Sequence, residues 1–248
     1  MNTSETKVIL ITGAGRRIGR MIAEYLHDQG MRVIIHCHQS ETLAREFCDT
    51  LNKRRENSAA VVVADLAEFA ALADMVREAV AVWGYVDALV NNASAFYPTS
   101  VGEVTESQWQ NLLDTNLKAP FFLAQALAPV LTKRGGSIIN ISDIHAQKPL
   151  RHYPVYSISK AGIDMLTQSL AKELAPALRV NAVAPGVIYW PEGANEQQEA
   201  IQREIVSRVA LKKVGNPLDI AKTVKFLLKA DYITGQVIAV DGGRLLNC

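Results

Sequence analysis

Short runs of apolar, mostly β-branched residues alternate along the chain with longer stretches in which apolar positions recur every three or four residues. The spacing in the longer stretches predicts helices at about 17–29, 41–52, 68–83, 106–133, 155–175 and 217–229. The short runs have the length of strands and lie at 8–11, 33–35, 60–63, 88–90, 137–141, 179–183 and 237–240. Strands that are apolar throughout and separated by helices are typical of a parallel sheet buried on both faces. The pattern predicts an α/β fold, a doubly wound parallel sheet whose ligands bind at the carboxyl ends of the strands.

The least regular stretch is 185–213, which contains Pro191, Gly193 and a polar run at 195–202. A mobile loop that covers substrate and a solvated insertion both fit this composition, and its position late in the fold favours the loop. No repeat or linker divides the chain. We therefore expect one domain over residues 1–248, with a substrate-loop insertion at about 186–213.

Composition excludes several classes of protein. Of the 248 residues, 49% are hydrophobic, enough for a sizeable core, and the net charge of +1 gives no basis for binding nucleic acid or an acidic membrane. No apolar run approaches the roughly 20 residues of a membrane span, and the polar start does not resemble a signal peptide. Cys37, Cys48 and Cys248 lack the spacing of metal ligands. We expect reduced thiols in a cytoplasmic protein without a metal site.

A glycine-rich turn directly follows the first predicted strand, at residues 12–19, and leads into a helix. Glycines in such a turn let backbone N–H groups approach a pyrophosphate at the helix N-terminus. The turn predicts a Rossmann-like dinucleotide site, with close packing of strand and helix without a ligand as the alternative. The residues expected to line it are Gly13, Arg16, Arg17 and Ile18.

The charge after the second strand indicates which dinucleotide is bound. An acidic residue there would bond the ribose 2′-hydroxyl and repel a 2′-phosphate. The chain instead has His36, His38 and Ser40, and its first carboxylate is Glu41. With the arginines of the turn nearby, this predicts NADPH, although the histidines are equally compatible with plain edge residues. The further residues expected to contact adenosine and the nicotinamide ribose are Asp65, Leu66, Asn92 and Ala93.

Tyr156 and Lys160 are four residues apart, so a helix places them on one face. An ammonium beside a phenol lowers the tyrosine pKa toward neutrality, which suits proton transfer in catalysis. Asp143, thirteen residues earlier, adds a second proton carrier. The pattern predicts a catalytic centre.

These motifs together resemble the short-chain dehydrogenase/reductase family over nearly the whole chain. The matching segments are the turn at 12–19, Asn91-Asn92-Ala93, Asn116, Tyr156 with Lys160, Pro185-Gly186 and Asp241-Gly242-Gly243. The resemblance implies a usually tetrameric enzyme with an Asn–Ser–Tyr–Lys catalytic set. It also implies that Asn116 supports a water chain to Lys160, and that Tyr156, Lys160, Pro185 and Gly186 border the cofactor. By itself, Asn116 fits a polar residue bonding a helix backbone equally well.

Three departures narrow the resemblance. Arg17 replaces the second glycine of the turn, Ser94 replaces the glycine of Asn-Ala-Gly, and Asp143 replaces the catalytic serine. Together they resemble the pteridine reductase subgroup, which includes trypanosomatid pteridine reductases and bacterial dihydromonapterin reductases.

The resemblance implies a pterin held between the nicotinamide and Phe96, with Arg17 and Ser94 bonding pterin and phosphate atoms. Offset stacking of aromatic rings contributes about 0.5–1.5 kcal/mol. Phe96 in the core is the alternative. Tyr97 fits a pocket wall and a loop anchor equally well.

The predicted reaction is NADPH-dependent reduction of a dihydropterin, such as dihydrobiopterin, dihydromonapterin or dihydrofolate, by hydride transfer to a C=N carbon and protonation through Tyr156. An ionised Asp143 would repel the oxyanion that forms in ketone reduction, whereas a carboxyl–phenol pair suits a ring nitrogen. This requires that Asp143, rather than Ser142, faces the site. The alternatives are a ketone or oxoacyl-thioester reductase and, more remotely, a non-catalytic NADP(H) sensor. Surplus apolar positions on the helices at 106–133 and 155–175 predict self-association, and the family resemblance implies that the assembly is a homotetramer.

Overall fold

The computed structural model describes residues 6–189 and 196–247 and contains one seven-stranded parallel sheet. The strand order is β3-β2-β1-β4-β5-β6-β7. The strands are β1 Val8–Ile11, β2 Arg32–Cys37, β3 Ala59–Val63, β4 Ala88–Asn91, β5 Ser137–Ile141, β6 Arg179–Pro185 and β7 Val237–Val240. All the predicted strands are therefore confirmed. Strands β2 and β6 continue beyond their predicted ends because each keeps pairing with its neighbour there.

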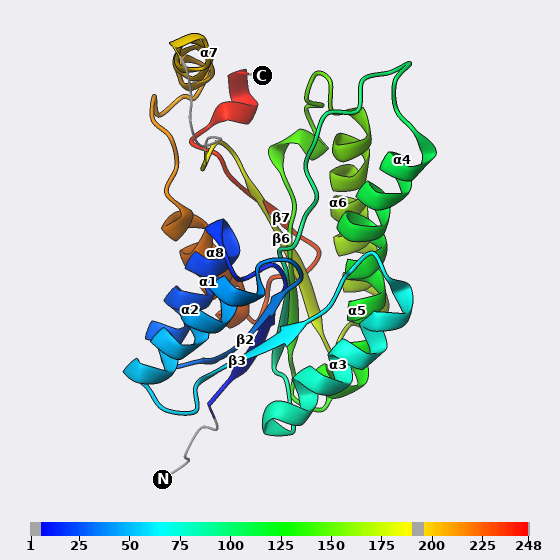
Figure 1. Ribbon diagram of the computed structural model, residues 1–248, viewed down its shortest axis with the longest axis vertical. Helices are drawn as coiled ribbons and strands as arrows, with labels where there is room; N and C mark the ends of the chain where they lie inside the picture. Colours follow the sequence, from blue (N-terminus) through cyan, green and yellow to red (C-terminus); the bar gives the residue numbers. More distant parts are fainter. Residues whose placement is uncertain (1–5, 190–195, 248) are drawn as a thin grey trace.

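Helices cover both faces of the sheet, as Figure 1 shows. On one face lie α1 (Arg17–Asp28), α2 (Glu41–Arg54) and α8 (Pro217–Lys229), which bury Ile22, Phe47 and Val224 against the strands. On the other lie α3 (Phe69–Trp83), α5 (Ala119–Thr132) and α6 (Pro154–Leu174), which bury Leu72, Leu123 and Ile163. The expected doubly wound α/β architecture is confirmed, since two apolar cores enclose the sheet.

The sheet reverses its direction of growth between β1 and β4. These two strands are neighbours, with Ile11 paired to Val90 at their carboxyl ends. The chain builds outward from β1 to β3 on one side and from β4 to β7 on the other. Connections that leave neighbouring strands in opposite directions open a crevice at their carboxyl ends. The turns after β1 and β4 therefore lie side by side at the place where a ligand is expected.

The helix predicted at 106–133 is not α-helical throughout. It consists of α4 (Glu106–Leu113), a π-helical turn (Asp114–Lys118) and α5. A π-turn inserts one extra residue into a helix and is often found at functional sites. Apolar periodicity did not reveal it, because α4 and α5 each keep their own buried residues. Asn116, a predicted site residue, lies in this turn and is buried.

The stretch at 185–213 is more regular than its composition suggested. It includes α7 (Glu196–Ser207), which the sequence reading did not predict. Residues 190–195, with Pro191 and Gly193, lie outside the described residues. The interpretation of this stretch as a substrate loop stays a prediction.

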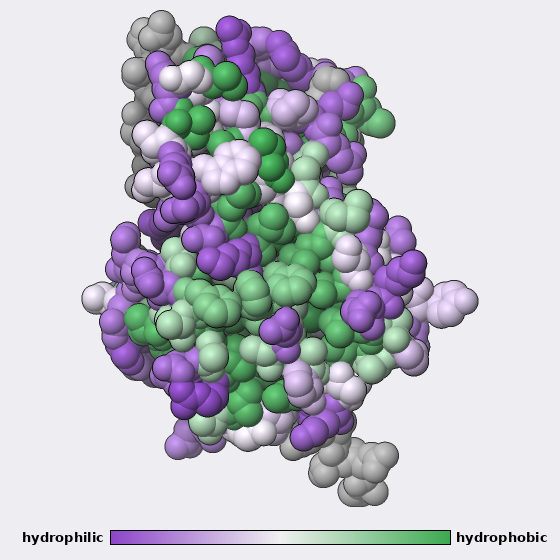
Figure 2. Space-filling model, turned by 90° about the vertical axis from the view of Figure 1, so that its right-hand side faces the viewer, coloured by the Kyte–Doolittle hydropathy of each residue, from purple (hydrophilic) through white to green (hydrophobic). Residues whose placement is uncertain are grey.

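A large part of one face is apolar. Figure 2 shows apolar side chains gathered on the side formed by α3, α4 and α5 at the right of Figure 1. Exposed large apolar residues on these helices and on α6 are Phe69, Trp109, Phe121, Ile158 and Met165. Within the described part of the chain, none of the helices combines the length and apolar character needed to cross a bilayer.

Candidate active site

Tyr156 and Asp143 meet at the carboxyl end of β5. The Tyr156 hydroxyl donates a hydrogen bond of 2.7 Å to Asp143 Oδ2. The other carboxylate oxygen accepts a bond of 2.8 Å from the His145 backbone N–H, which caps the 3₁₀ turn Ile144–Ala146. Because both oxygens are engaged, the carboxylate is fixed against the phenol. The structure thus brings together two of the predicted catalytic residues.

Ser142 does not take the place of Asp143. Its hydroxyl donates to Asp164 Oδ1, one helical turn beyond Lys160 on α6. The two adjacent residues 142 and 143 therefore engage different turns of the same helix. The condition set by the sequence argument, that Asp143 rather than Ser142 faces Tyr156, is met in this structure.

Lys160 is almost completely buried, with 3% of its surface exposed. Its ammonium donates a hydrogen bond of 2.9 Å to the Ile141 carbonyl and lies 5.7 Å from the centre of the Tyr156 ring. Burial lowers the pKa of Lys160 to about 8, while the negative charges of Asp143 and Asp164 oppose that change. Lys160 is thus held beside the tyrosine, as predicted.

The expected effect of Lys160 on the tyrosine was wrong. Burial, followed by the charge and the hydrogen bond of Asp143, raises the pKa of Tyr156 well above its ordinary value. The carboxylate is in direct contact with the phenol and disfavours a second negative charge there, whereas the ammonium is farther away. Tyr156 therefore keeps its proton at neutral pH and is equipped to donate one.

Asn116 fastens the turn after β4 to α6. Its Oδ1 accepts bonds from the Ala95 N–H at 2.7 Å and the Ser94 hydroxyl at 3.2 Å. Its Nδ2 donates to the Ala95 carbonyl and to the Ser159 hydroxyl, both at 3.0 Å. These contacts place Ser94 and Asn116 together beside the catalytic helix. A water chain from Asn116 to Lys160 stays a prediction.

Phe96 lies at the mouth of the site rather than in the core, with 55% of its surface exposed. Its ring stacks on Tyr153 at 4.6 Å with an interplanar angle of 14°, and meets Tyr156 edge-on at 4.8 Å. Tyr153 was not among the predicted site residues. Because it lies three residues before Tyr156, at the start of α6, the helical spacing could have placed it beside the site.

Tyr97 anchors the same loop to α4. Its hydroxyl donates to the Gln108 carbonyl at 3.1 Å and to Asn111 Oδ1 at 2.9 Å. Of the two interpretations left open by the sequence, the structure favours an anchor beneath the loop. The neighbouring Phe96 is thereby held from two sides, by Tyr97 and by Asn116.

The turns after β1 and β4 are packed closely against each other. Gly13 has a positive φ of +64°, and a Cβ atom on it would lie 2.9 Å from Ala93 Cα. A Cβ on Gly19 would lie 2.4 Å from Asn92 Nδ2. Asn92 Nδ2 also donates to the carbonyls of Thr12 at 2.8 Å and Gly13 at 3.1 Å. Glycine is therefore required at both positions, and the Asn92 side chain serves the turn itself.

The N-terminus of α1 has the chemistry of a pyrophosphate site. Among the described residues, no side chain caps it, and its first turn carries no acidic residue. Arg16 and Arg17 flank it, and Ile18 follows with its side chain packed against the core. Arg17 has a left-handed φ of +53°, and its guanidinium lies 5.3 Å from the centre of the Tyr189 ring. Exposed helix N–H groups beside two guanidinium groups suit a phosphate ligand.

His36 shapes this turn and is not a bystander. Its Nδ1 lies 3.1 Å from the Gly13 nitrogen and its Nε2 3.1 Å from the Ala64 oxygen. Only the tautomer with hydrogen on Nε2 satisfies both partners. Burial lowers the pKa of His36 to about 4, so the ring is neutral at physiological pH. The imidazole thus connects the turn after β1 to the end of β3.

The residues beyond β2 lie where a 2′-phosphate is expected. A Cβ on Gly15 would lie 2.8 Å from Ser40 Oγ, so the serine hydroxyl adjoins the glycine-rich turn. Glu41 accepts a 2.7 Å ion pair from Arg45 along α2. The first carboxylate after β2 is therefore engaged on its own helix.

At the end of β3, His38 and Asp65 face each other. His38 Nε2 lies 3.7 Å from Asp65 Oδ2, and Asp65 Oδ1 accepts a bond of 2.9 Å from the Ala67 N–H. Leu66 buries its side chain in the core. Contacts of these three residues with adenosine stay predictions.

Gly186 follows β6 where the backbone passes close to Asp241. A Cβ on Gly186 would lie 2.7 Å from Asp241 Cα, and the Gly186 N–H donates to the Val240 carbonyl at 3.0 Å. The Asp241 carboxylate accepts bonds of 2.8 Å from the backbone N–H groups of Gly243 and Leu245. Pro185 and Gly186 therefore lie at the same edge of the sheet as Asp143.

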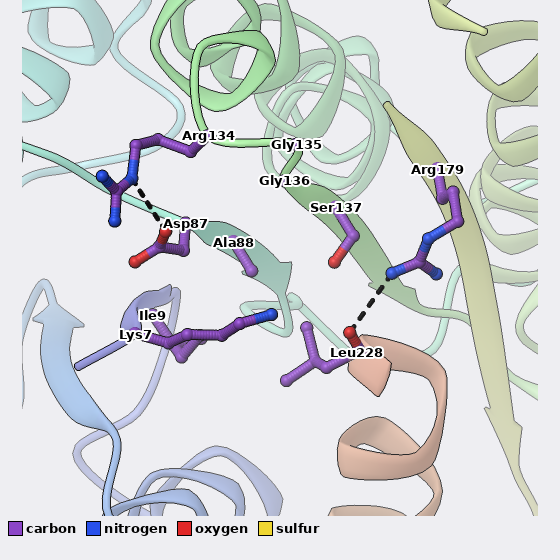
Figure 3. Close-up of a pocket in the computed structure, with 10 residues that line it drawn as sticks. All are labelled: Lys7, Ile9, Asp87, Ala88, Arg134, Gly135, Gly136, Ser137, Arg179 and Leu228. Atoms are coloured by element: carbon purple, nitrogen blue, oxygen red, sulfur yellow. Dashed lines mark hydrogen bonds and ion pairs between the residues drawn. The ribbon is translucent and has the colours of Figure 1, made fainter. Parts of the chain in front are cut away.

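A small cavity at the opposite edge is structural. Figure 3 shows that Arg134 reaches Asp87, at 3.0 Å, and Arg179 reaches the end of α8. The cavity also adjoins Lys7 and measures ≈ 10 Å³, about the space of one water molecule. It lies at the amino ends of the strands, away from Tyr156.

Comparison with known proteins bears on this geometry. A family model described as enoyl-(acyl carrier protein) reductase, from the short-chain dehydrogenase group, matches residues 13–244. The chain belongs to the short-chain dehydrogenase/reductase family. This confirms the resemblance drawn from the glycine-rich turn and the Tyr156–Lys160 pair.

Within the short-chain dehydrogenase/reductase family, relatives of two activities are equally similar. The chain is 36% identical to pteridine reductase 1 of Leishmania tarentolae, with 100% of the chain and 99% of the relative covered. It is also 36% identical to the 3-oxoacyl-(acyl-carrier-protein) reductases FabG of Staphylococcus epidermidis and Staphylococcus aureus strain Mu50, with 97% of the chain and 99% of each relative covered. Overall identity supports a reductase of this family and does not separate pterin reduction from oxoacyl reduction.

The three departures from the family pattern lie around one crevice. Asp143, at the position of the family's serine, bonds Tyr156, and Ser94 bonds Asn116. Arg17 keeps a backbone conformation that suits glycine but carries a guanidinium. All three residues therefore lie beyond the carboxyl ends of strands, on the side of the sheet where ligands of this fold bind.

Proposed function

We propose that this chain is an NADPH-dependent reductase of dihydropterins, forming tetrahydropterins. The observation that carries the proposal is the 2.7 Å hydrogen bond from Tyr156 to Asp143, at the position where a family ketone reductase has a serine. A serine hydroxyl donates to the oxyanion that forms as a ketone is reduced. A carboxylate at that place repels the same oxyanion, which argues for a substrate without a reacting carbonyl.

A C=N bond fits this pair of residues. Reduction of its carbon leaves the adjacent ring nitrogen needing a proton. Tyr156 keeps its proton because burial and Asp143 raise its pKa. Asp143, in contact with the hydroxyl, relays a replacement proton from solvent. As Tyr156 donates its proton to the ring nitrogen, a proton that Asp143 has taken from solvent passes to the tyrosine oxygen, so no phenolate is left facing the carboxylate.

The cofactor is held by the chain's own donors. The uncapped N-terminus of α1 with Arg16 and Arg17 would hold the pyrophosphate, and Ser40 with His38 would hold the 2′-phosphate. Lys160, buried beside Tyr156, would bond the nicotinamide ribose. Bound NADPH supplies the hydride. The run from His36 to Ser40 at the end of β2 contains no carboxylate to bond a ribose 2′-hydroxyl, which supports NADPH over NADH.

Phe96 and Tyr153 supply an aromatic wall for a flat heterocycle. The exposed Phe96 ring contacts Tyr156 edge-on and is braced by Tyr153 behind it. A pterin stacked on Phe96 places its ring nitrogens beside the Tyr156 hydroxyl. Ser94 and Arg17 are the polar groups proposed to bond the pterin edge.

Reduction of oxoacyl thioesters is the second candidate, favoured by the FabG relatives at the same identity. It predicts turnover of a β-ketoacyl thioester and tolerance of Asp143→Ser. The deciding experiment follows NADPH oxidation with dihydrobiopterin, dihydromonapterin, dihydrofolate, a β-ketoacyl thioester and simple ketones, each repeated with NADH. Turnover of a dihydropterin with NADPH supports the proposal, and activity confined to the carbonyl compounds refutes it.

We further propose that the chain forms a homotetramer in a reducing compartment such as the cytoplasm. The apolar face formed by α3, α4 and α5 supports self-association, since large exposed apolar patches commonly mark contact surfaces. Cys37 and Cys48 are free and buried, as expected in a reducing environment, whereas Cys248 lies outside the described residues. Light scattering tests the tetramer, and a monomer at micromolar concentration would contradict it.

A further inference from the structure

Three successive residues at the end of β5 are connected to three successive turns of α6. Tyr156, Lys160 and Asp164 are spaced four apart and lie on one face of the helix. Asp143 accepts from Tyr156, the Ile141 carbonyl accepts from Lys160, and Ser142 donates to Asp164. The first two contacts belong to the catalytic centre already described. The third, between Ser142 and Asp164, includes none of the predicted catalytic residues.

Asp164 lies in the electrostatic environment of Lys160. The ionisable groups that face Lys160 are Asp164 and Tyr156 from α6 and Asp143 from the turn after β5. Burial raises the pKa of Asp164, while the Ser142 hydrogen bond and the charge of Lys160 oppose that rise, and the charge of Asp164 in turn opposes the effect of burial on Lys160. Ser142, itself buried, fixes one oxygen of the Asp164 carboxylate. A second negative charge therefore lies one helical turn from Lys160, bonded to the residue next to Ile141, whose carbonyl holds the ammonium.

The two carboxylates differ in what happens to them during the reaction. Asp143 contacts the Tyr156 hydroxyl, so its proton occupancy changes if it relays a proton. Asp164 contacts Ser142 and lies one turn farther from the tyrosine. It keeps its charge while the proton moves. A buried ammonium without a steady counter-charge favours its neutral form, because burial disfavours the charge.

We propose that Asp164 is a positioning residue that, held by Ser142, supplies a constant negative charge one helical turn from Lys160 and so keeps the lysine charged through the catalytic cycle. The proposal rests on the proposed roles of Tyr156 and Lys160, but it applies to whichever substrate the enzyme reduces. It assigns a function to Asp164 beyond the Tyr–Lys pair.

The test is the pH dependence of kcat and of the KM for NADPH, from pH 6 to 10. Tyr156 holds its proton beyond this range, so the alkaline limb reports Lys160, whose pKa is about 8. Asp164→Asn removes the charge but keeps an oxygen that accepts from Ser142. We expect its alkaline limb to move down by about one pH unit, the effect of a nearby opposite charge. Turnover at pH 8 would fall about fivefold, with little change at pH 6.

Two matched variants separate charge from structure. Asp164→Glu retains the charge and should restore the wild-type limb. Ser142→Ala removes the hydrogen bond that holds the carboxylate but leaves its charge, so its limb should move down by less than that of Asp164→Asn. If Asp164→Asn does not fold, Asp164→Ser replaces it, since this variant also removes the charge and leaves a hydroxyl to bond Ser142.

An alkaline limb that is unchanged in the neutral variant overturns the proposal, whatever its stability. So does an equal displacement of the limb in Asp164→Glu, because packing rather than charge would then be responsible. The assay uses any substrate that the protein turns over. A failure of the pterin proposal in the substrate panel and a failure of the Asp164 proposal in the pH profile are therefore distinct results.

Discussion

Tyr156 donates its hydroxyl hydrogen to Asp143 Oδ2 over 2.7 Å. The contact does more than hold the phenol in place. It adds to the effect of burial in raising the tyrosine pKa, so that the phenol stays protonated where the enzyme works. An enzyme that oxidises an alcohol needs a base at this position, whereas one that reduces its substrate needs an acid. The pair is suited to reduction.

Asp143→Ser should exchange one substrate class for another. Removing the carboxylate takes away the repulsion toward an oxyanion and lets the pKa of Tyr156 fall, since Asp143 contributes to its rise. We expect kcat for a dihydropterin to drop by about 100-fold, the range for losing a positioned proton carrier. Turnover of a ketone should appear or increase. Parallel NADPH assays on both substrates measure this, and unchanged pterin turnover would contradict it.

Tyr156→Phe removes the proton donor and keeps the ring. A decrease in kcat of at least about 100-fold is expected, with the KM for NADPH nearly unchanged. Tyr153→Phe is the matched control, because it removes a hydroxyl three residues away and preserves the stack on Phe96. That variant should keep turnover within a few fold. Similar losses in the two variants would argue against a special role for Tyr156.

Phe96→Ala should weaken substrate binding through loss of the aromatic wall. Stacking contributes about 0.5–1.5 kcal/mol, so the KM for a pterin should rise by about 2- to 12-fold. Phe226→Ala serves as the control, since Phe226 has a similar exposure of 54% but lies on α8. Steady-state kinetics of both variants distinguish a local effect from a general one. An unchanged KM in Phe96→Ala would remove this residue from the site.

Arg17→Gly should weaken cofactor binding without destabilising the fold. The left-handed backbone at Arg17 costs a residue with a side chain about 1–2 kcal/mol, which glycine avoids. The same change removes a guanidinium expected to contact phosphate, worth about 1.5–3 kcal/mol. We expect the KM for NADPH to rise by about 10- to 100-fold, with an equal or higher melting temperature.

The control for that variant is Asn57→Gly. Asn57 has a similar φ of +52° but lies in the turn between α2 and β3. Its substitution relaxes the backbone, removes the hydrogen bond that Asn57 Oδ1 accepts from Trp83 Nε1, and should leave the KM for NADPH unchanged. A fall in the melting temperature of Arg17→Gly would show that its side chain serves the fold.

Activity and the Lys160 contribution to stability should change in opposite directions above pH 8. The pKa of Lys160 is about 8 in the folded chain and 10.5 in the unfolded chain, so between these two pH values the unfolded chain binds a proton that the folded chain has released. The free energy of unfolding therefore increases as pH rises through this window. Below pH 8 the contribution of Lys160 to stability is at its lowest. Turnover should decline over the same interval. Denaturant unfolding of wild type and Lys160→Met at pH 7 and 9.5 tests this, and equal pH dependence of the two would contradict it.

The strands were predictable because each is a short, mostly apolar run. Strands β1, β4 and β5 are buried along their whole length, and the edge strands β3 and β7 are partly exposed. Helix boundaries followed equally well where one apolar stripe continues, as in α1 and α8. The π-turn at Asp114–Lys118 was not visible, because one inserted residue displaces a stripe without erasing it. Helix α7 was missed because its sequence is largely polar, with few apolar positions to set a period.

The part of the site that lies in short sequence motifs was predictable. The spacing of Tyr156 and Lys160 placed them correctly, and the aspartate at 143 reached the phenol. The sign of the tyrosine pKa shift was not predictable, because it depends first on the burial of the phenol and then on its direct contact with the Asp143 carboxylate. The roles of His36 and Asn116 in fixing loops also required coordinates, since their partners are far away in the sequence.

The π-turn has a consequence for how the helix from Glu106 to Thr132 tolerates change. Removing one residue from Asp114–Lys118 would allow ordinary α-helical bonding throughout and rotate everything beyond it by about a quarter turn. The helix would become more regular, yet Asn116 could no longer hold Ala95 and Ser159 together. The loop that carries Phe96 therefore depends on the π-turn. Deletions at Asp114–Lys118 should be tolerated less well than substitutions.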